Sequence, residues 1–319
     1  MARTALYPLK FHPVFKSKVW GGRRLAAWGK RLPPGTQIGE SWELADRPDD
    51  RSVIANGPLA GLTLHEVLRK RRGELLGAVA DRAIEEFPIL IKMIHAREDL
   101  SIQVHPDDAA ARRFSGLSYG KVEAWHVLEA RPGATMIFGL KPRTTRSVLK
   151  SAVRNGCVPG LVRRVPVRRG DTLLIEPGIV HAIGAGIVLL EVQQNTDITY
   201  RLYDWGRLAS HGRRMHVEES LGSIRYGARP ARVIHDRGRR RQRLVQCDRF
   251  EIELRRGEFE EQINAFRGLS IVRGRGRLQW EDGRQCCAIR RGETILIPAS
   301  VGRYRVEGRS VEALVWKEG

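Results

Sequence analysis

The sequence predicts a mainly β protein made of two barrels in tandem, with one small helical segment. From residue 87 onward, short runs of Val, Ile and Leu recur between Gly and Pro turns, a cadence typical of antiparallel sandwiches and barrels. The segment Arg168–Pro177 is also repeated as Arg290–Pro298 with one residue deleted, which predicts that the second barrel repeats the first. The clearest strand segments are 87–94, 134–139, 171–176 and 187–192.

The repeat and an Arg-rich stretch place the expected domain boundary near residue 230. Residues 1–230 are expected to form the first domain, with a helical segment at about 62–86, and residues 231–319 the second. A chain of 319 residues is long enough to bury a substantial core.

Two helices are expected in the first domain. Thr63 suits an N-cap with Glu66 three residues later, and apolar residues then recur at helical spacing from 64 to 86. Gly73 is expected to split this helix. A second helix is expected over residues 144–155, with Gly156 as its C-terminal stop.

The segment most informative about function is Ser101–Asp108. Gln103 and His105 lie two residues apart in an expected strand closed by a Pro-Asp-Asp turn, so both side chains should point to one face of a sheet. Glu123 and His181 follow later in the chain, His181 just after a Pro-Gly turn. Taken singly, each of these residues more often has a structural role. Together, an amide, a carboxylate and two imidazoles would suit Zn²⁺ or another first-row divalent ion.

These motifs resemble the type I phosphomannose isomerases, specifically the short bacterial form within the cupin superfamily. The matching blocks occur in order from residue 7 to about 207, whereas the last third of the chain matches only in general pattern. The resemblance implies two tandem cupin-like jelly-roll barrels and mannose-6-phosphate isomerase activity. It rests on YPLK at 7–10, IGESWE at 38–43, IQVHPDD at 102–108, GKVEAW at 120–125, PGIVHAIG at 177–184 and EVQQNTDITYR at 191–201.

The resemblance also implies roles for single residues. Gln103, His105, Glu123 and His181 match the family's zinc ligands, which implies one Zn²⁺ per chain. Arg201 matches a position treated as catalytic, and its guanidinium could also bind a phosphate group.

Further cavity residues are expected around the substrate. Lys121 and Lys92 could supply positive charge to the phosphate, with Ser101 adding a hydroxyl, and the resemblance implies substrate-binding or site-wall roles for all three. Lys121 is also placed among the catalytic residues. Glu191 and Asp197 are both candidates for the base that moves the proton, and either could instead be a hydrogen-bonded structural carboxylate.

Aldose–ketose isomerisation moves a proton between C1 and C2 through a cis-enediol. It needs a base near those carbons and stabilisation of the developing oxyanion, to which a metal contributes as a Lewis acid. We therefore expect a zinc-dependent isomerase that interconverts mannose 6-phosphate and fructose 6-phosphate. The alternative is a non-catalytic cupin that binds or senses a sugar phosphate; the joint presence of the ligands, Lys121 and Arg201 disfavours it.

A formal net charge of +20 can indicate nucleic-acid binding, but the distribution of the basic residues argues against a specific nucleic-acid site. Only ten of the 56 basic residues are Lys, and the Arg excess is spread along the chain. The densest run, at 237–243, has no interleaved aromatic residues and no accompanying nucleic-acid-binding motif. We expect a positive field that attracts anionic sugar phosphates, and no specific nucleic-acid partner.

A cytoplasmic location without membrane contact is expected. No run of 18 or more apolar residues occurs, and the first residues lack the apolar core of a signal peptide. The four cysteines show no CxxC spacing and are expected to be buried or free thiols in a reducing compartment. The sequence leaves the oligomeric state open between a monomer and a homodimer.

The second barrel is expected to be metal-free and structural. Aligning the repeats places Gly302 opposite His181, and residues 255–275 contain no His. The remaining histidines, His126 and His211 among them, have no partner at ligand spacing and are expected at the surface or in the core.

Overall fold

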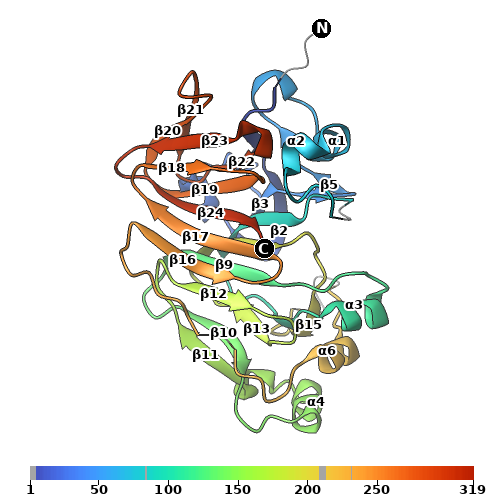
Figure 1. Cartoon of the computed structure of the whole chain (residues 1–319). Coiled ribbons are helices and arrows are strands. Elements are labelled where there is room, and N and C mark those ends of the chain that lie inside the picture. The colour runs from blue at the N-terminus through green and yellow to red at the C-terminus, as the bar shows by residue number, and fades with distance from the viewer. Residues whose placement is uncertain (1–4, 83–84, 208–212, 231) are drawn as a thin grey trace.

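The computed structural model describes residues 5–82, 85–207, 213–230 and 232–319. Most of its elements are strands in antiparallel sheets, as predicted. Two pairs of sheets follow one another along the chain, an N-terminal unit and a C-terminal unit. In Figure 1 the orange and red C-terminal strands lie above the green and yellow strands of the N-terminal unit.

The N-terminal unit contains a six-stranded and a five-stranded sheet. Their strand orders are β12-β9-β14-β7-β3-β2 and β11-β10-β13-β8-β15. The four predicted strand segments all form strands, β7, β10, β12 and β14, with ends displaced by no more than two residues. The strands are Val14–Gly22 (β2), Ile38–Leu44 (β3), Ile89–Ala96 (β7), Ile102–Val104 (β8), Glu123–Ala130 (β9), Thr135–Leu140 (β10), Val162–Pro166 (β11), Thr172–Ile175 (β12), His181–Ile183 (β13), Ile187–Gln194 (β14) and Tyr200–Tyr203 (β15).

The C-terminal unit contains a seven-stranded and a four-stranded sheet, ordered β16-β17-β24-β19-β22-β1-β6 and β18-β23-β20-β21. A separate short hairpin joins Asp46–Arg47 (β4) to Asp50–Arg51 (β5). The strands of the unit are Leu9–His12 (β1), Val53–Ile54 (β6), Arg241–Gln246 (β16), Phe250–Arg256 (β17), Phe259–Gln262 (β18), Arg267–Arg273 (β19), Arg275–Trp280 (β20), Gln285–Arg290 (β21), Thr294–Ile297 (β22), Arg303–Glu307 (β23) and Glu312–Glu318 (β24).

Two strands from the start of the chain complete the C-terminal unit. Leu9 of β1 pairs with Leu296 of β22, and Phe11 of β1 pairs with Ile54 of β6. The units also share one apolar core, in which Leu128 of β9 belongs to the same buried cluster as Leu254 of β17. Folding of the two units is therefore coupled. The domain boundary at residue 230 or 231 stays a prediction, and residue 231 lies outside the described part of the chain.

The helical segment is shorter than predicted. Leu64–Lys70 (α1) begins with the expected capping box between Thr63 and Glu66. The break before Arg72–Leu76 (α2) falls at Arg71, whose φ of −140° is not helical, and Gly73 lies inside α2. The backbone at Gly77 turns to φ 64°, which ends the helix ten residues before the predicted limit of 86. Residues 83 and 84 of that segment are not described.

The second predicted helix is confirmed as Arg146–Arg154 (α4), and Gly156 follows it with φ 68°. Among the described residues, two further helices were not predicted, Asp108–Ser115 (α3) and Val217–Ser223 (α6). The expected Pro-Asp-Asp turn is the start of α3, where Asp107 accepts a hydrogen bond from the Ala110 amide as an N-cap. In the described part of the chain, no helix is long and apolar enough to span a membrane.

Candidate metal centre and active site

Four side chains predicted as ligands come from both sheets of the N-terminal unit. Gln103 lies on β8 and His105 just after it, while His181 begins β13 and pairs with Gln103. Glu123 begins β9 in the six-stranded sheet. The ligand atoms of His105, Glu123 and His181 lie within 4.8 Å of one another, and all three residues are buried.

Backbone carbonyls orient both imidazoles. Nδ1 of His105 lies 2.9 Å from the Ile198 carbonyl oxygen, and Nδ1 of His181 lies 2.8 Å from that of Ile179. A carbonyl oxygen can only accept, so each Nδ1 carries the proton and each Nε2 presents a lone pair to the centre. Burial lowers the pKa of His105 and brings the pKa of His181 to about 3, so both rings are neutral.

These donors fit a cation. Nε2 of His105 is 3.3 Å from Oε1 of Glu123, and Nε2 of His181 is 3.6 Å from the same oxygen. Lone pairs therefore face lone pairs, and neither Nε2 of His105 nor Oε1 of Glu123 has a hydrogen-bond partner. Such groups are costly to bury unless a positive charge binds them. Two imidazoles and a carboxylate suit Zn²⁺ and other first-row divalent ions.

Gln103 completes the set if its amide is turned over. Its Nε2 lies 3.4 Å from Nε2 of His181, while Ser101 Oγ is 3.3 Å from its Oε1. Rotating the amide by 180° exchanges oxygen and nitrogen without moving the side chain. Oε1 would then face the metal position, and the Ser101 hydroxyl would accept from Nε2. In that orientation Ser101 would support the predicted ligand Gln103, in addition to the substrate contact predicted for it.

A cavity of about 230 Å³ opens beside this cluster. All six residues predicted to act on or bind the substrate line it, together with Gln103, one of the predicted ligands. Several cavity residues were not assigned a role from the sequence. The lining comprises Lys18, Trp20, Glu40, Lys92, Ile94, Leu100, Ser101, Gln103, Lys121, Trp125, Ile183, Glu191, Asp197, Thr199, Arg201 and Arg213.

Two lysines and two carboxylates form a network along the cavity. Nζ of Lys92 is 2.8 Å from Asp197 and 3.5 Å from Glu191. Nζ of Lys121 is 2.7 Å from the ligand Glu123 and 4.0 Å from Glu191. Each lysine thus connects Glu191 to another carboxylate.

The environments of the two candidate bases differ. Burial and the neighbouring carboxylate of Glu123 raise the pKa of Glu191 to about 7, despite Lys121 and Lys92. For Asp197, burial opposes ionisation, but the Lys92 ammonium lowers the pKa well below its ordinary value. Its side chain is 43% exposed, so its desolvation is modest and the lysine dominates. Near neutral pH, Glu191 can exchange a proton and Asp197 stays ionised.

Arg201 faces the cavity beside the metal position. It lies opposite Gln103 in the pairing of β15 with β8. One terminal nitrogen donates to the Arg214 carbonyl oxygen at 2.7 Å, whereas its buried Nε has no hydrogen-bond partner. Among the described residues, no carboxylate lies within 4 Å of its guanidinium, so neither Asp197 nor Glu191 is its salt-bridge partner. The free donor is available to a ligand.

Sequence reasoning missed three charged residues of the cavity. Glu40 accepts a hydrogen bond from Trp42 Nε1 at 2.8 Å and pairs with Lys18 at 3.3 Å. Glu40 lies in the block IGESWE, which was used for the resemblance but given no role, and Lys18 precedes it by one strand. Arg213 lies outside every motif, so no local signal could have identified it.

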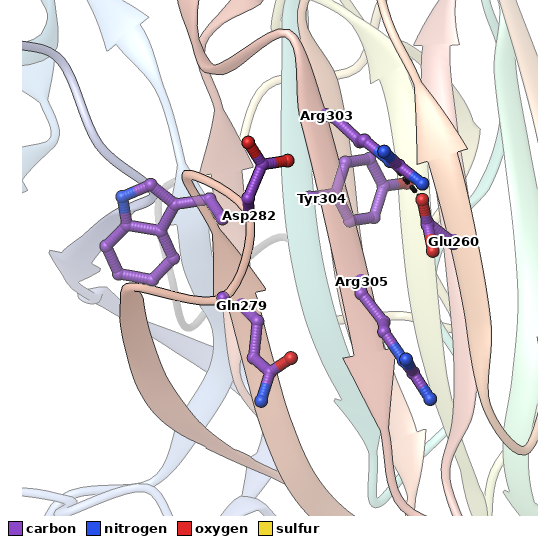
Figure 2. A pocket seen from close by; sticks show the side chains of 8 residues that line it. Glu260, Gln279, Asp282, Arg303, Tyr304 and Arg305 are labelled. Carbon is purple, nitrogen blue, oxygen red and sulfur yellow. Dashed lines mark hydrogen bonds and ion pairs between the residues drawn. The ribbon is translucent and has the colours of Figure 1, made fainter.

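A second hollow, of about 260 Å³, lies on the C-terminal unit. Figure 2 shows Arg303 directed toward Glu260, with Gln279 and Arg305 further along the neighbouring strands. Its described lining residues form no cluster of metal-ligating side chains. The group around His105 is the only set of His, Cys, Asp or Glu able to hold a metal among the residues that the structure describes.

The chain is similar in sequence to a known protein family. Residues 8–120 match the family model described as phosphomannose isomerase type I, catalytic domain. The chain is 35% identical over 313 residues to mannose-6-phosphate isomerase ManA of Bacillus subtilis (strain 168). That alignment covers 94% of this chain and 96% of the relative. It is 32% identical to the mannose-6-phosphate isomerase of Streptococcus mutans, over 94% of this chain and 95% of that protein.

Solved structures agree with the fold. The crystal structure of mannose 6-phosphate isomerase from Bacillus subtilis superposes with a TM-score of 0.88 at 30% identity, covering 98% of this chain and all of that one. A putative mannosephosphate isomerase from Archaeoglobus fulgidus superposes with a TM-score of 0.81 at 22% identity and 98% and 97% coverage. At that identity, the second match supports the fold alone.

Proposed function

The chain belongs to the type I phosphomannose isomerase family of enzymes, and on that premise we propose that it interconverts mannose 6-phosphate and fructose 6-phosphate through a cis-enediol, using one bound Zn²⁺. The observation that carries the proposal is the convergence of His105, Glu123 and His181, next to a cavity whose lining includes Gln103, Glu191 and Arg201. A metal centre, a titratable carboxylate and a guanidinium are the parts that this isomerisation needs.

The metal position is assigned to Gln103, His105, Glu123 and His181. When bound, the ion would act as a Lewis acid on the substrate oxygens. The carbonyls of Ile198 and Ile179 hold the two imidazoles in the tautomer that a metal requires. Zn²⁺ is preferred because the set mixes nitrogen and oxygen donors in a buried site.

Proton transfer is assigned to Glu191. Trp125 Nε1 donates to its Oε2 at 2.8 Å, which leaves the buried Oε1 without a hydrogen-bond partner. That oxygen can take a proton from one substrate carbon and return it to the next. Asp197 is the weaker candidate because Lys92 holds its charge, and its proposed task is to keep the Lys92 ammonium in place.

The cationic groups have separable tasks. Arg201 lies opposite a metal ligand, so its unpartnered Nε can donate to the oxygen on which charge develops. Lys121 neutralises Glu123 and Glu191. Lys92 and Ser101 stay proposed substrate contacts, since both line the cavity.

Turnover separates this function from that of a binding protein. Fructose 6-phosphate formation from mannose 6-phosphate should be measured on the purified protein, after chelation, and after Zn²⁺ is restored. We expect activity to be lost on chelation and to return with the metal. Tight sugar-phosphate binding without turnover in the Zn²⁺-loaded protein would favour the non-catalytic alternative.

We also infer that the partner is a small-molecule sugar phosphate, that no nucleic acid is bound specifically, and that the protein is located in the cytoplasm. Monomer and homodimer stay open alternatives.

A further inference from the structure

A small cleft between the two units has no part in the proposed isomerase chemistry. Its volume is about 170 Å³. β9 of the N-terminal unit forms one wall, and β17, β19 and β24 of the C-terminal unit form another (Figure 1). The polar residues that line this inter-unit cleft are His126, Arg169, Asp236, Arg256, Arg273 and Glu312.

The inter-unit cleft is separate from the catalytic cavity. His126 lies on β9 three residues after Glu123, and the register of β9 with β12 is unbroken between them. Successive side chains of a strand point to opposite faces, so His126 and Glu123 lie on opposite faces of the six-stranded sheet. The described linings of the cleft and of the cavity also have no residue in common. A ligand in the cleft would therefore leave the catalytic cavity free.

The guanidinium groups of the inter-unit cleft outnumber its carboxylates by three to two. Arg256 pairs with Asp236 and lies 3.6 Å from Glu312. Arg273 lies 3.1 Å from the same Glu312 oxygen. Both carboxylates thus already have cationic partners. Arg169 forms no ion pair with any described carboxylate, so one cation of the cleft has no counter-charge there.

The buried His126 offers an unpartnered nitrogen to the same cleft. Burial lowers its pKa to about 4, so near neutral pH the ring carries one proton. Nδ1 lies 2.9 Å from the Thr172 hydroxyl oxygen, and that hydroxyl can donate to it. The ring proton is then on Nε2, for which the described residues provide no hydrogen-bond partner. This N–H group is available to a ligand that accepts a hydrogen bond.

The C-terminal unit shows how the corresponding position is satisfied within the protein. β9 and β12 place Thr172 opposite His126, and the corresponding strands β19 and β22 place Thr294 opposite Ser270. The Ser270 hydroxyl lies 3.0 Å from that of Thr294 and also accepts from Trp316 Nε1 at 3.1 Å. That pair therefore has a third protein partner. His126 has none, and its open donor faces a cleft with an unpaired cation.

We propose that the inter-unit cleft binds a small oxyanion, either inorganic phosphate or the phosphate group of a small metabolite, between Arg169, Arg273 and His126. A guanidinium suits the role because it donates two parallel hydrogen bonds to phosphate oxygens, and the imidazole adds a further donor. The anion would bridge the two units, because Arg273 comes from β19 and the other two residues from the N-terminal unit. The competing explanation is that Arg169 is only a solvated surface residue.

Substitution of Arg169 by Gln tests the proposal, with Arg168→Gln as the matched control. The Arg168 side chain is 76% exposed, does not line the cleft, and lies 3.8 Å from Asp171. Asp171 keeps its hydrogen bond from His235 at 2.7 Å when Arg168 is replaced, so loss of this exposed pair should matter little. The two variants thus remove equal charges at adjacent positions, and only one of them alters the cleft.

The measurement is the melting temperature against inorganic phosphate concentration, with chloride exchanged to keep the ionic strength constant. Phosphate should stabilise the wild-type protein and Arg168→Gln equally, whereas the apparent dissociation constant should be about tenfold higher in Arg169→Gln. Arg273→Gln, from the other wall, should weaken the response in the same way. Any phosphate bound in the catalytic cavity contributes equally to all four proteins, and KM for mannose 6-phosphate should be unchanged in all of them.

The source of the phosphate group is identified by repeating the titration with glycerol 3-phosphate. A response to both compounds identifies the phosphate group of a small metabolite, and a response to inorganic phosphate alone identifies the free anion; either result supports the site. Equal responses in Arg169→Gln and Arg168→Gln would overturn the proposal. So would an unchanged response in Arg273→Gln, or a change in KM that accounts for the weaker response of Arg169→Gln.

Discussion

The two units share a strand arrangement but differ at the position of the metal. The order β12-β9-β14-β7-β3 in the N-terminal unit corresponds to β22-β19-β24-β17-β16 in the C-terminal unit, and β10-β13-β8 corresponds to β20-β23-β18. Glu123 begins β9 and pairs with Ile175, just as Arg267 begins β19 and pairs with Ile297. A carboxylate in one unit is thus an arginine in the other.

By strand pairing, Tyr304 takes the place of His181 in the second unit, two residues after the Gly302 that the repeat in the sequence aligns with it. His181 pairs with Gln103 across β13 and β8, and Tyr304 pairs with Glu261 across β23 and β18. A 3-10 turn precedes β23 in the C-terminal unit, and its exit at Gly302 shifts the register. Tyr304 is the first residue of β23 whose side chain is buried.

The C-terminal unit carries its own positive charge where the N-terminal unit presents lone pairs. Arg267 Nε donates to Glu261 at 2.8 Å, and the Tyr304 hydroxyl donates to the other Glu261 oxygen at 2.7 Å. The position after Glu261 that corresponds to His105 is Ile263, which is buried. A guanidinium and a hydroxyl satisfy the carboxylate without an ion. One fold can thus fill the same place either with protein hydrogen-bond donors or with metal-ligating side chains, which supports the proposal of a metal-free second unit.

Loss of either imidazole should have the largest effect. His105→Ala or His181→Ala removes one neutral nitrogen donor, and we expect metal occupancy to fall and turnover to drop by about three orders of magnitude or more. The β-rich fold should persist. Elemental analysis and kinetics on the same preparations provide the check. Tyr304→Phe, which changes only the second unit, is the control and should retain the metal bound in the N-terminal unit. Wild-type metal content and activity in both histidine variants would refute the assignment.

Substitution of Arg201 should affect catalysis without affecting stability. Because its Nε has no protein partner, Arg201→Lys should leave the melting temperature nearly unchanged while kcat falls by about two orders of magnitude, the scale for loss of a preorganised electrostatic donor. Bound metal should be retained. A large drop in melting temperature with near-normal kcat would instead assign Arg201 to the fold.

Breaking the charge network of the second unit should have the reverse effect. Arg267→Met leaves the Glu261 carboxylate with Tyr304 and the more distant Arg255, 3.8 Å away. Uncompensated charge in a partly buried site should lower the free energy of unfolding by about 2–3 kcal/mol. Metal content and kcat per folded molecule should stay at wild-type levels. Chemical denaturation and elemental analysis of the same variant provide the check. Loss of bound metal from the folded variant would show that the second unit contributes to the metal site.

The last expected effect is confined to acidic pH and concerns the contact between the units. His126 on β9 is buried, and its Nδ1 lies 2.9 Å from the Thr172 hydroxyl oxygen. Burial lowers its pKa to about 4, and although Asp236 opposes this shift, Arg256 of the second unit reinforces it. Between about pH 4 and 6.5, the unfolded chain therefore binds a proton that the folded chain does not.

Stability from this group should be complete above about pH 7 and decrease as the pH falls toward 4, by up to about 3 kcal/mol. His126→Gln should flatten that dependence relative to the wild type in denaturation curves measured across the range. Identical pH profiles for the two proteins would show that His126 is not the source.

Much of the fold and the site could be predicted locally. Runs of Val, Ile and Leu between Gly and Pro turns located four of the strands within two residues, and the Thr63 capping box located the start of α1. Helix ends were less predictable, because the break at Arg71 depends on a backbone angle that many residue types adopt. The start of α3 was mistaken for a turn since Asp serves equally well in a turn and as an N-cap. His211, expected at the surface or in the core, lies outside the described residues.

The sequence by itself determined the mainly β class, the repeated unit, and the chemistry of the four expected ligands, because these follow from periodicity and residue type. Only the tertiary structure decided that Lys18, Glu40 and Arg213 share the cavity with them, and that Tyr304 and Arg267 take the corresponding places in the second unit. Pairing between strands far apart in the chain sets these neighbours. One residue of register moves a side chain to the opposite face of a sheet, so no local pattern encodes them.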